Sequence, residues 1–195
     1  MNKIINWLEN SFSPKMNKIA SNAWVSAVSG AMMKILPFIL VGSLIFFYNV
    51  FRSYIPALPD LSIILQFTFQ MISLVLVFMI ANQAMDKLEH PQYQINAGIT
   101  AILVYIMTCL PSVDADSMMS LDFSRLGPSG MFVAIVIGLF VSLIYHLFAK
   151  LHVLENSTSI PDFVGEWINN IIPIFIAVAI TMIIVNYCTI DLYKL

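Results

Sequence analysis

Three histidines and two cysteines are the residues of this chain most able to do chemistry. His146 lies near the end of an apolar run, where an imidazole could bind a substrate or a phosphoryl group. An interfacial ring with satisfied hydrogen bonds is the commoner arrangement. His90 and His152 fall in more polar segments. Cys109 and Cys188 are too few and too far apart for a disulfide framework or a zinc site, and a pairing between the two stays open.

Amide side chains offer a second kind of chemistry. Gln66 and Gln70 are four residues apart, so they share one face of a helix. Amides bind hydroxyl groups well, and this pair could line a sugar path, with interhelical hydrogen bonding as the alternative. The sequence contains no phosphate-binding loop, nucleophile elbow or metal-ligand motif. We therefore expect no catalytic residue, no metal and no cofactor, and the substrate-binding residues stay unknown.

Composition indicates where these side chains must be positioned. Of 195 residues, 59% are hydrophobic and only 10% are charged, whereas a soluble domain carries about 25% charged residues. The net charge is −2, so there is no basic surface for nucleic acid. The composition excludes an ordinary soluble enzyme and favours a protein that lies in a lipid bilayer.

Five runs without Asp, Glu, Lys or Arg predict five transmembrane helices, because a helix crosses the bilayer with about 20 apolar residues. The predicted spans are residues 35–51, 62–85, 95–110, 129–149 and 168–190. We therefore predict an all-α, multi-pass membrane protein whose five-helix transmembrane domain occupies residues 31–195.

Residues 1–30 predict two short amphipathic helices divided at Ser13 and Pro14, with apolar side chains at helical spacing. These helices lie on the inner leaflet or pack on the bundle, with Trp7, Trp24 and Lys34 as interfacial anchors. Six of the nine Lys and Arg residues fall on the N-terminal side of the membrane. This bias predicts a cytoplasmic N-terminus, and the odd number of spans then predicts an outside C-terminus.

The fourth span carries a regular pattern of small residues. Gly130, Ala134, Gly138 and Ser142 recur every four residues. Such a stripe lets another helix backbone approach closely. The sequence leaves open whether that helix belongs to the same chain or to a second copy.

Four stretches carry a more specific pattern: the amphipathic start at 1–20, Met33–Ser43, Leu126–Gly138 and Ile160–Pro173. In order and spacing they resemble the membrane subunit, EIIC, of the lactose/cellobiose class of bacterial phosphotransferase-system sugar transporters. The family-like positions are Pro37, Gly42, Gly127, Phe132 and Pro161. The likeness covers essentially the whole chain and departs at Pro161, which Asp162 follows where the family tends to have a second proline.

The resemblance implies the oligomerisation half of an EIIC-like component in a bacterial plasma membrane. It implies a homodimer. The residues of the sugar-binding half match nothing here, so the chain either acts with a second membrane polypeptide that supplies this half or survives as a fragment. By itself such a chain is not an enzyme. The alternative is a stand-alone membrane scaffold, regulator, or immunity or receptor-type protein derived from that domain, without transport activity.

Overall fold

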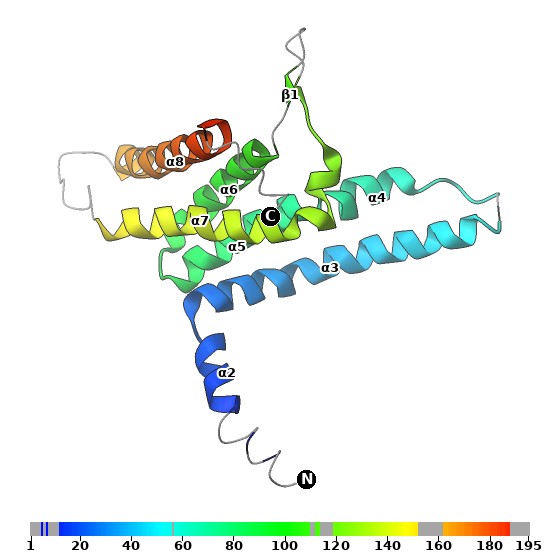
Figure 1. Cartoon of the computed structure of the whole chain (residues 1–195), viewed down its shortest axis with the longest axis horizontal. Helices are drawn as coiled ribbons and strands as arrows, with labels where there is room; N and C mark the ends of the chain where they lie inside the picture. Colours follow the sequence, from blue (N-terminus) through cyan, green and yellow to red (C-terminus); the bar gives the residue numbers. More distant parts are fainter. Residues whose placement is uncertain are drawn as a thin grey trace.

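The apolar runs of the sequence fold as helices, because backbone groups in lipid must be hydrogen-bonded within their own segment. The computed structural model describes residues 5, 7, 12–55, 57–109, 112–113, 119–151 and 162–187. Its long helices lie roughly along one direction, and a short helix leads away from the bundle at the start of the first of them (Figure 1). The helices are α2 (Ser13–Ala20), α3 (Ala23–Arg52), α4 (Ser62–Thr68), α5 (Ile72–Lys87), α6 (Gln94–Thr108), α7 (Met131–Lys150) and α8 (Asp162–Tyr187).

Short elements connect these helices. Single 3-10 turns join α4 to α5 and begin α6, and two more lead into α7. A two-stranded antiparallel hairpin lies between α6 and α7, with Ser112 opposite Ser120. The connecting elements are η2 (Phe69–Met71), η3 (Pro91–Tyr93), β1 (Ser112–Val113), β2 (Met119–Ser120), η4 (Phe123–Leu126) and η5 (Pro128–Gly130).

The predicted all-α membrane class is confirmed, and each of the five predicted runs is largely helical. Within the described residues, three helical segments are long and apolar enough to cross a membrane: Ala23–Arg52, Ser62–Lys87 and Pro128–Lys150. A shorter apolar helix covers Asn169–Val185. The 15 residues of α6 extend about 22 Å at 1.5 Å each, less than the hydrocarbon core of about 30 Å. Crossing by α6 and α8 therefore stays a prediction.

Helix α3 begins earlier than the sequence predicted. Its N-cap is Asn22, whose side chain accepts a hydrogen bond from the Trp24 backbone N–H at 3.0 Å. Ala27, Ala31 and Ile35 are all fully buried at a spacing of four, so one packed face continues through this region. The predicted boundary between 1–30 and 31–195 consequently lies inside a continuous helix. Of the two predicted amphipathic helices, the first lies almost wholly outside the described residues. The second, predicted from Met16 to Ala27, is divided: α2 ends at Ala20, and the residues from Ala23 onward belong to α3.

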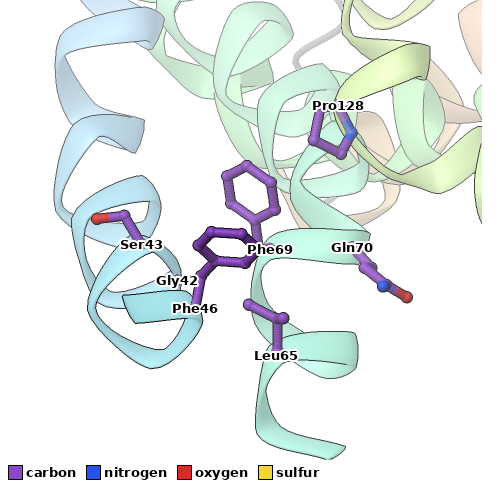
Figure 2. Close-up of a pocket in the computed structure, with 7 residues that line it drawn as sticks. All are labelled: Gly42, Ser43, Phe46, Leu65, Phe69, Gln70 and Pro128. Carbon is purple, nitrogen blue, oxygen red and sulfur yellow. The ribbon is translucent and has the colours of Figure 1, made fainter. Parts of the chain in front are cut away.

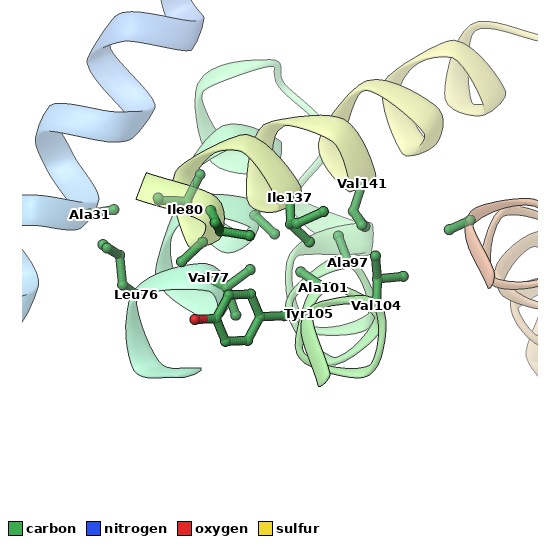
Figure 3. Close-up of a cluster of buried hydrophobic side chains, with 14 of the residues drawn as sticks. Ala31, Leu76, Val77, Ile80, Ala97, Ala101, Val104, Tyr105, Ile137 and Val141 are labelled. Carbon is green, nitrogen blue, oxygen red and sulfur yellow. The ribbon is translucent and has the colours of Figure 1, made fainter. Parts of the chain in front are cut away.

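Helix α5 forms the centre of the bundle and packs against α3, α6 and α7. Its Leu76, Val77 and Ile80 are fully buried. Small and branched side chains of α6 and α7 close around them (Figure 3). These partners include Ala97, Ala101, Val104, Ile137 and Val141.

Hydroxyl groups inside this core are paired. Thr100 Oγ1 lies 3.0 Å from the hydroxyl of Tyr145 and joins α6 to α7. The Tyr105 hydroxyl donates to the Arg125 carbonyl oxygen at 2.7 Å. Such bonds stabilise a membrane bundle because an unpaired polar group in hydrocarbon is costly.

Candidate functional site

The second predicted span is not one continuous helix. α4 ends at Thr68, η2 covers Phe69–Met71, and α5 begins at Ile72. The backbone departs from helical angles at Thr68 (φ −102°, ψ −80°) and at Met71 (φ −113°, ψ 15°). The Thr68 hydroxyl donates to the Ile64 carbonyl oxygen at 2.8 Å, a bond that often accompanies helix bending. The sequence predicts a helical span over 62–85 without this break, which went unpredicted because it contains neither proline nor glycine.

Glycine allows other segments to approach this break closely. A Cβ atom on Gly42 of α3 would lie 2.8 Å from Phe69 Cβ, so this approach requires glycine. On the other side, the Ser73 hydroxyl donates to the Gly127 carbonyl oxygen at 2.6 Å. Two of the family-like positions, far apart in sequence, thus contact the same broken segment.

A cavity of about 470 Å³ lies beside the break. The rings of Phe46 and Phe69 and the side chain of Leu65 lie together in its wall, whereas the polar ends of Ser43 and Gln70 turn away from them (Figure 2). A methylene fills roughly the volume of a water molecule, about 30 Å³, so the space suits an acyl chain in size. The walls suit an apolar chain better than a hydroxyl-rich sugar.

Two smaller cavities flank the same break. One, of about 300 Å³, is lined by Pro37, Phe38, Val41 and Thr68. The other, of about 320 Å³, includes both Gln66 and Gln70 in its wall, together with Phe67, Met71 and Phe123. Gln66 and Gln70 therefore line the same surface, as their spacing predicts. Both side chains are exposed in the single chain.

Beyond the break, α4 and the second half of α3 form an arm, defined here as residues 42–68. The tip of the arm is held by polar contacts. The guanidinium of Arg52 lies 3.1 Å from the Asp60 carboxylate and also donates to the Leu58 carbonyl oxygen at 3.2 Å. The hydroxyl and backbone N–H of Ser62, with a smaller effect of Arg52, hold the pKa of Asp60 below its usual range.

One face of α3 has large apolar side chains without cover in this chain. We call this face the α3 outer stripe: Leu36, Leu40, Leu44, Phe47 and Phe51, which are 47%, 61%, 68%, 60% and 50% exposed. On the same helix the Asn49 Oδ1 atom is buried and has no hydrogen-bond partner among the described residues. A bilayer or another protein chain could cover the stripe, but only a polar group could satisfy the asparagine.

The fold has a close counterpart among solved structures. The chain matches the crystal structure of the transporter ChbC, the IIC component from the N,N′-diacetylchitobiose-specific phosphotransferase system, with a TM-score of 0.73 and 20% identity. The match covers 91% of this chain and 46% of that one. The fold is that of a IIC component. No protein-family model matches the chain, and no curated protein sequence matches it.

Within this IIC fold, the small-residue stripe of α7 packs inside the chain. A Cβ atom on Gly138 would lie 2.8 Å from Ile80 Cγ2 on α5, and one on Gly130 would overlap the Arg125 carbonyl oxygen. Ala134 and Ser142 are fully buried. The helix that approaches the stripe is therefore α5 of the same chain.

The remaining predicted positions are spread over the IIC fold. Trp24 packs edge-on against the ring of His146, with centroids 6.0 Å apart. Trp7 is 57% exposed and Phe132 is 72% exposed, and Lys34 is exposed on α3. Pro37, as described above, lines a cavity.

Some predicted positions cannot be placed. Pro161, His152 and Cys188 lie outside the described residues, whereas Cys109 is buried at the end of α6. The pairing of the two cysteines, which the sequence leaves open, is therefore not tested by the described residues.

Two features of the structure, a helix break and a contact, could not be predicted from the sequence. The Phe69–Met71 break has no sequence signal beyond the polar residues Thr68 and Gln70. The approach of His90 to His146 joins residues 56 positions apart, and their rings lie at one end of the bundle. No spacing rule brings such distant residues together.

Proposed function

We propose that these 195 residues act as the oligomerisation half of an EIIC-like membrane component of a sugar phosphotransferase system. The single observation that carries the proposal is the ChbC match, which spans nearly all of this chain and under half of that transporter. The sugar-binding half then comes from another polypeptide or segment. The protein lies in a bacterial plasma membrane with its N-terminus in the cytoplasm and its C-terminus outside.

The exposure of the α3 outer stripe supports an oligomeric role. The outer stripe of α3 is widely exposed, and the apolar stretch of this helix is 17% buried, compared with 50% for α7. A second copy that packs on the stripe would bury these side chains. Closed two-fold pairing is the commonest arrangement of identical chains.

The broken second helix supports a place in a transporter. Gly42 lies ten residues before the end of α3 at Arg52, about 15 Å along the helix axis and so about half of the hydrocarbon thickness. Transporters often place discontinuous helices at the bilayer midplane. The cavity beside this break is apolar, which favours a structural or lipid-filled junction over a sugar site in this chain.

Native mass spectrometry of the protein in mild detergent tests the proposal. We expect two copies of the chain, and a sugar-binding measurement with N,N′-diacetylchitobiose and cellobiose should give no saturable binding. Leu44→Trp on the outer stripe should convert dimers to monomers, whereas Phe175→Trp, on a position of α8 that is 72% exposed, should not. A monomeric unaltered chain, or saturable sugar binding by the chain alone, would contradict the proposal.

Co-purification from the protein's own cells separates the transporter role from the stand-alone alternative. Recovery with a second membrane polypeptide supports a split transporter, and sugar binding should then be found on the pair. A homodimer without such a partner overturns the transporter role and favours a scaffold without transport activity.

A further inference from the structure

Two histidine rings meet at the end of the bundle where α5 and α7 finish. His90 Nε2 lies 3.1 Å from His146 Nδ1, and the ring centroids are 5.1 Å apart. His90 belongs to the connection between α5 and η3, and His146 to the last turns of α7. Both rings are partly buried. The contact is distinct from the broken helix and its cavity.

The backbone of the α5 terminus places His90 in this position. Glu89 has a φ of 64°, the left-handed conformation that usually ends a helix at glycine. The His90 N–H donates to the Met85 carbonyl oxygen at 2.9 Å, and the Glu89 N–H donates to the Asp86 carbonyl oxygen at 3.2 Å. These two bonds form a Schellman motif. A non-glycine residue is therefore held in a costly conformation at the turn that directs His90 toward α7.

The partner ring is positioned by its own neighbours. The edge-on contact with Trp24 of α3 limits rotation of the His146 ring. The preceding residue, Tyr145, is fully buried and bonded to Thr100. Both imidazoles are thus fixed by separate, packed elements before any ligand arrives.

The separation of the two nitrogens suits a shared metal ion. Imidazole nitrogens bind zinc at about 2.0–2.1 Å, and two such ligands at a tetrahedral angle stand about 3.3 Å apart. The observed 3.1 Å differs from this by a few tenths of an ångström. Neutral imidazole has one protonated nitrogen, so the ring that donates in the hydrogen bond must move its proton to its other nitrogen before both rings can bind a metal.

We propose that His90 and His146 form a two-imidazole site for a divalent transition-metal ion that clamps the α5–α6 connection to α7. No group of three or more His, Cys, Asp or Glu residues is assembled in the part of the chain that the structure describes. Water completes the coordination sphere. The two protein ligands are imidazole nitrogens, whereas hard cations such as Mg²⁺ prefer oxygen ligands. Ions with a strong preference for imidazole, namely Cu²⁺, Ni²⁺ and Zn²⁺, are the class that fits.

Titration calorimetry with NiCl₂ and ZnCl₂ tests this site on the full chain, purified in mild detergent without a polyhistidine tag. We expect one saturable site per chain at pH 7.5. His90→Gln and His146→Gln should each weaken binding at least about tenfold, as loss of a metal-site contact generally does. The matched control is His152→Gln, which should bind as the unaltered protein does. At pH 5.5, below the ordinary histidine pKa of about 6.5, protons should displace the metal.

Two results would overturn the site. One is unchanged affinity in both His90→Gln and His146→Gln while His152→Gln loses binding. The other comes from electron paramagnetic resonance of the unaltered protein with one equivalent of Cu²⁺, which needs no variant to fold. Splitting from two imidazole nitrogens is expected, and a spectrum without nitrogen splitting would contradict the proposal.

Discussion

The α5–α7 contact and the arm are both built mainly from apolar residues but differ in how they are packed. Gly138 on α7 allows close approach to Ile80, and the α7 stretch is half buried. Gly42 on α3 allows an equally close approach to Phe69, but there the partner helix breaks and a cavity opens beside it. Hydrophobicity therefore identifies a membrane segment, whereas the order of small and large side chains decides which contacts are rigid.

A matched pair of glycine substitutions should separate the two regions most strongly. Gly138→Val forces a side chain against Ile80 on the packed α5 helix, and we expect a loss of about 2–3 kcal/mol in the free energy of unfolding. Gly42→Val meets Phe69 at a similar distance, but η2 can shift into the cavity, so we expect a loss of about 1 kcal/mol or less. Unfolding in mixed detergent micelles measures both. Equal losses would contradict the difference between the regions.

Removal of a hydroxyl should give the next largest difference in stability between the core and the arm. Thr100→Val leaves the buried Tyr145 hydroxyl without its bond across α6 and α7, which should cost about 1–2 kcal/mol. Thr68→Val removes a hydroxyl whose bonds, to the Ile64 and Leu65 carbonyl oxygens, stay within α4, and we expect a loss of less than about 0.5 kcal/mol. The same unfolding assay compares them. A larger effect at Thr68 would mean that the arm, and not the core, depends on its hydroxyl bonds.

At the C-terminal end of α5, a substitution should raise the free energy of unfolding rather than lower it. Glu89→Gly relieves the left-handed conformation at φ 64°, and we expect a gain of up to about 1 kcal/mol. Glu89→Ala, which keeps a Cβ atom, is the control and should give no such gain. A glycine variant less stable than the alanine variant would show that this turn does not hold the conformation described.

The smallest effect is expected at the tip of the arm. The pKa of Asp60 is lowered by Ser62 and Arg52. The ionised carboxylate therefore stabilises the tip fully above the ordinary carboxyl pKa, and this stabilisation is lost as the pH falls through the lowered pKa. Because Asp60 is exposed, we expect faster hydrogen exchange at residues 52–62 in Asp60→Asn, with no change in the global melting temperature. A global change would show that the tip stabilises the whole bundle.

Much of the fold could be predicted because lipid permits few backbone structures. The charge-free runs predicted the five helical segments, and the short motifs around Gly42 and Gly127 indicated the IIC-like fold that the ChbC match supports. The predicted boundary at residue 30 falls inside α3, where Ala27, Ala31 and Ile35 continue one packed face.

The two sites were harder to predict. The break at Phe69 follows from tertiary contacts with Gly42 and Gly127, which no local pattern encodes. The approach of His90 to His146 depends on how α5 and α7 pack. Such contacts become visible only when the helices are placed together.

Cysteine cross-linking in native membranes tests the central claim, that the α3 outer stripe is where a second copy packs. Leu40→Cys, Leu44→Cys and Phe47→Cys should each give covalent dimers on mild oxidation. All variants carry Cys188→Ser, so that the only native cysteine is the buried Cys109, and in this background Phe132→Cys and the chain without an added cysteine should stay monomeric. Dimers from Phe132→Cys but from none of the stripe positions would contradict the account and leave α3 facing lipid.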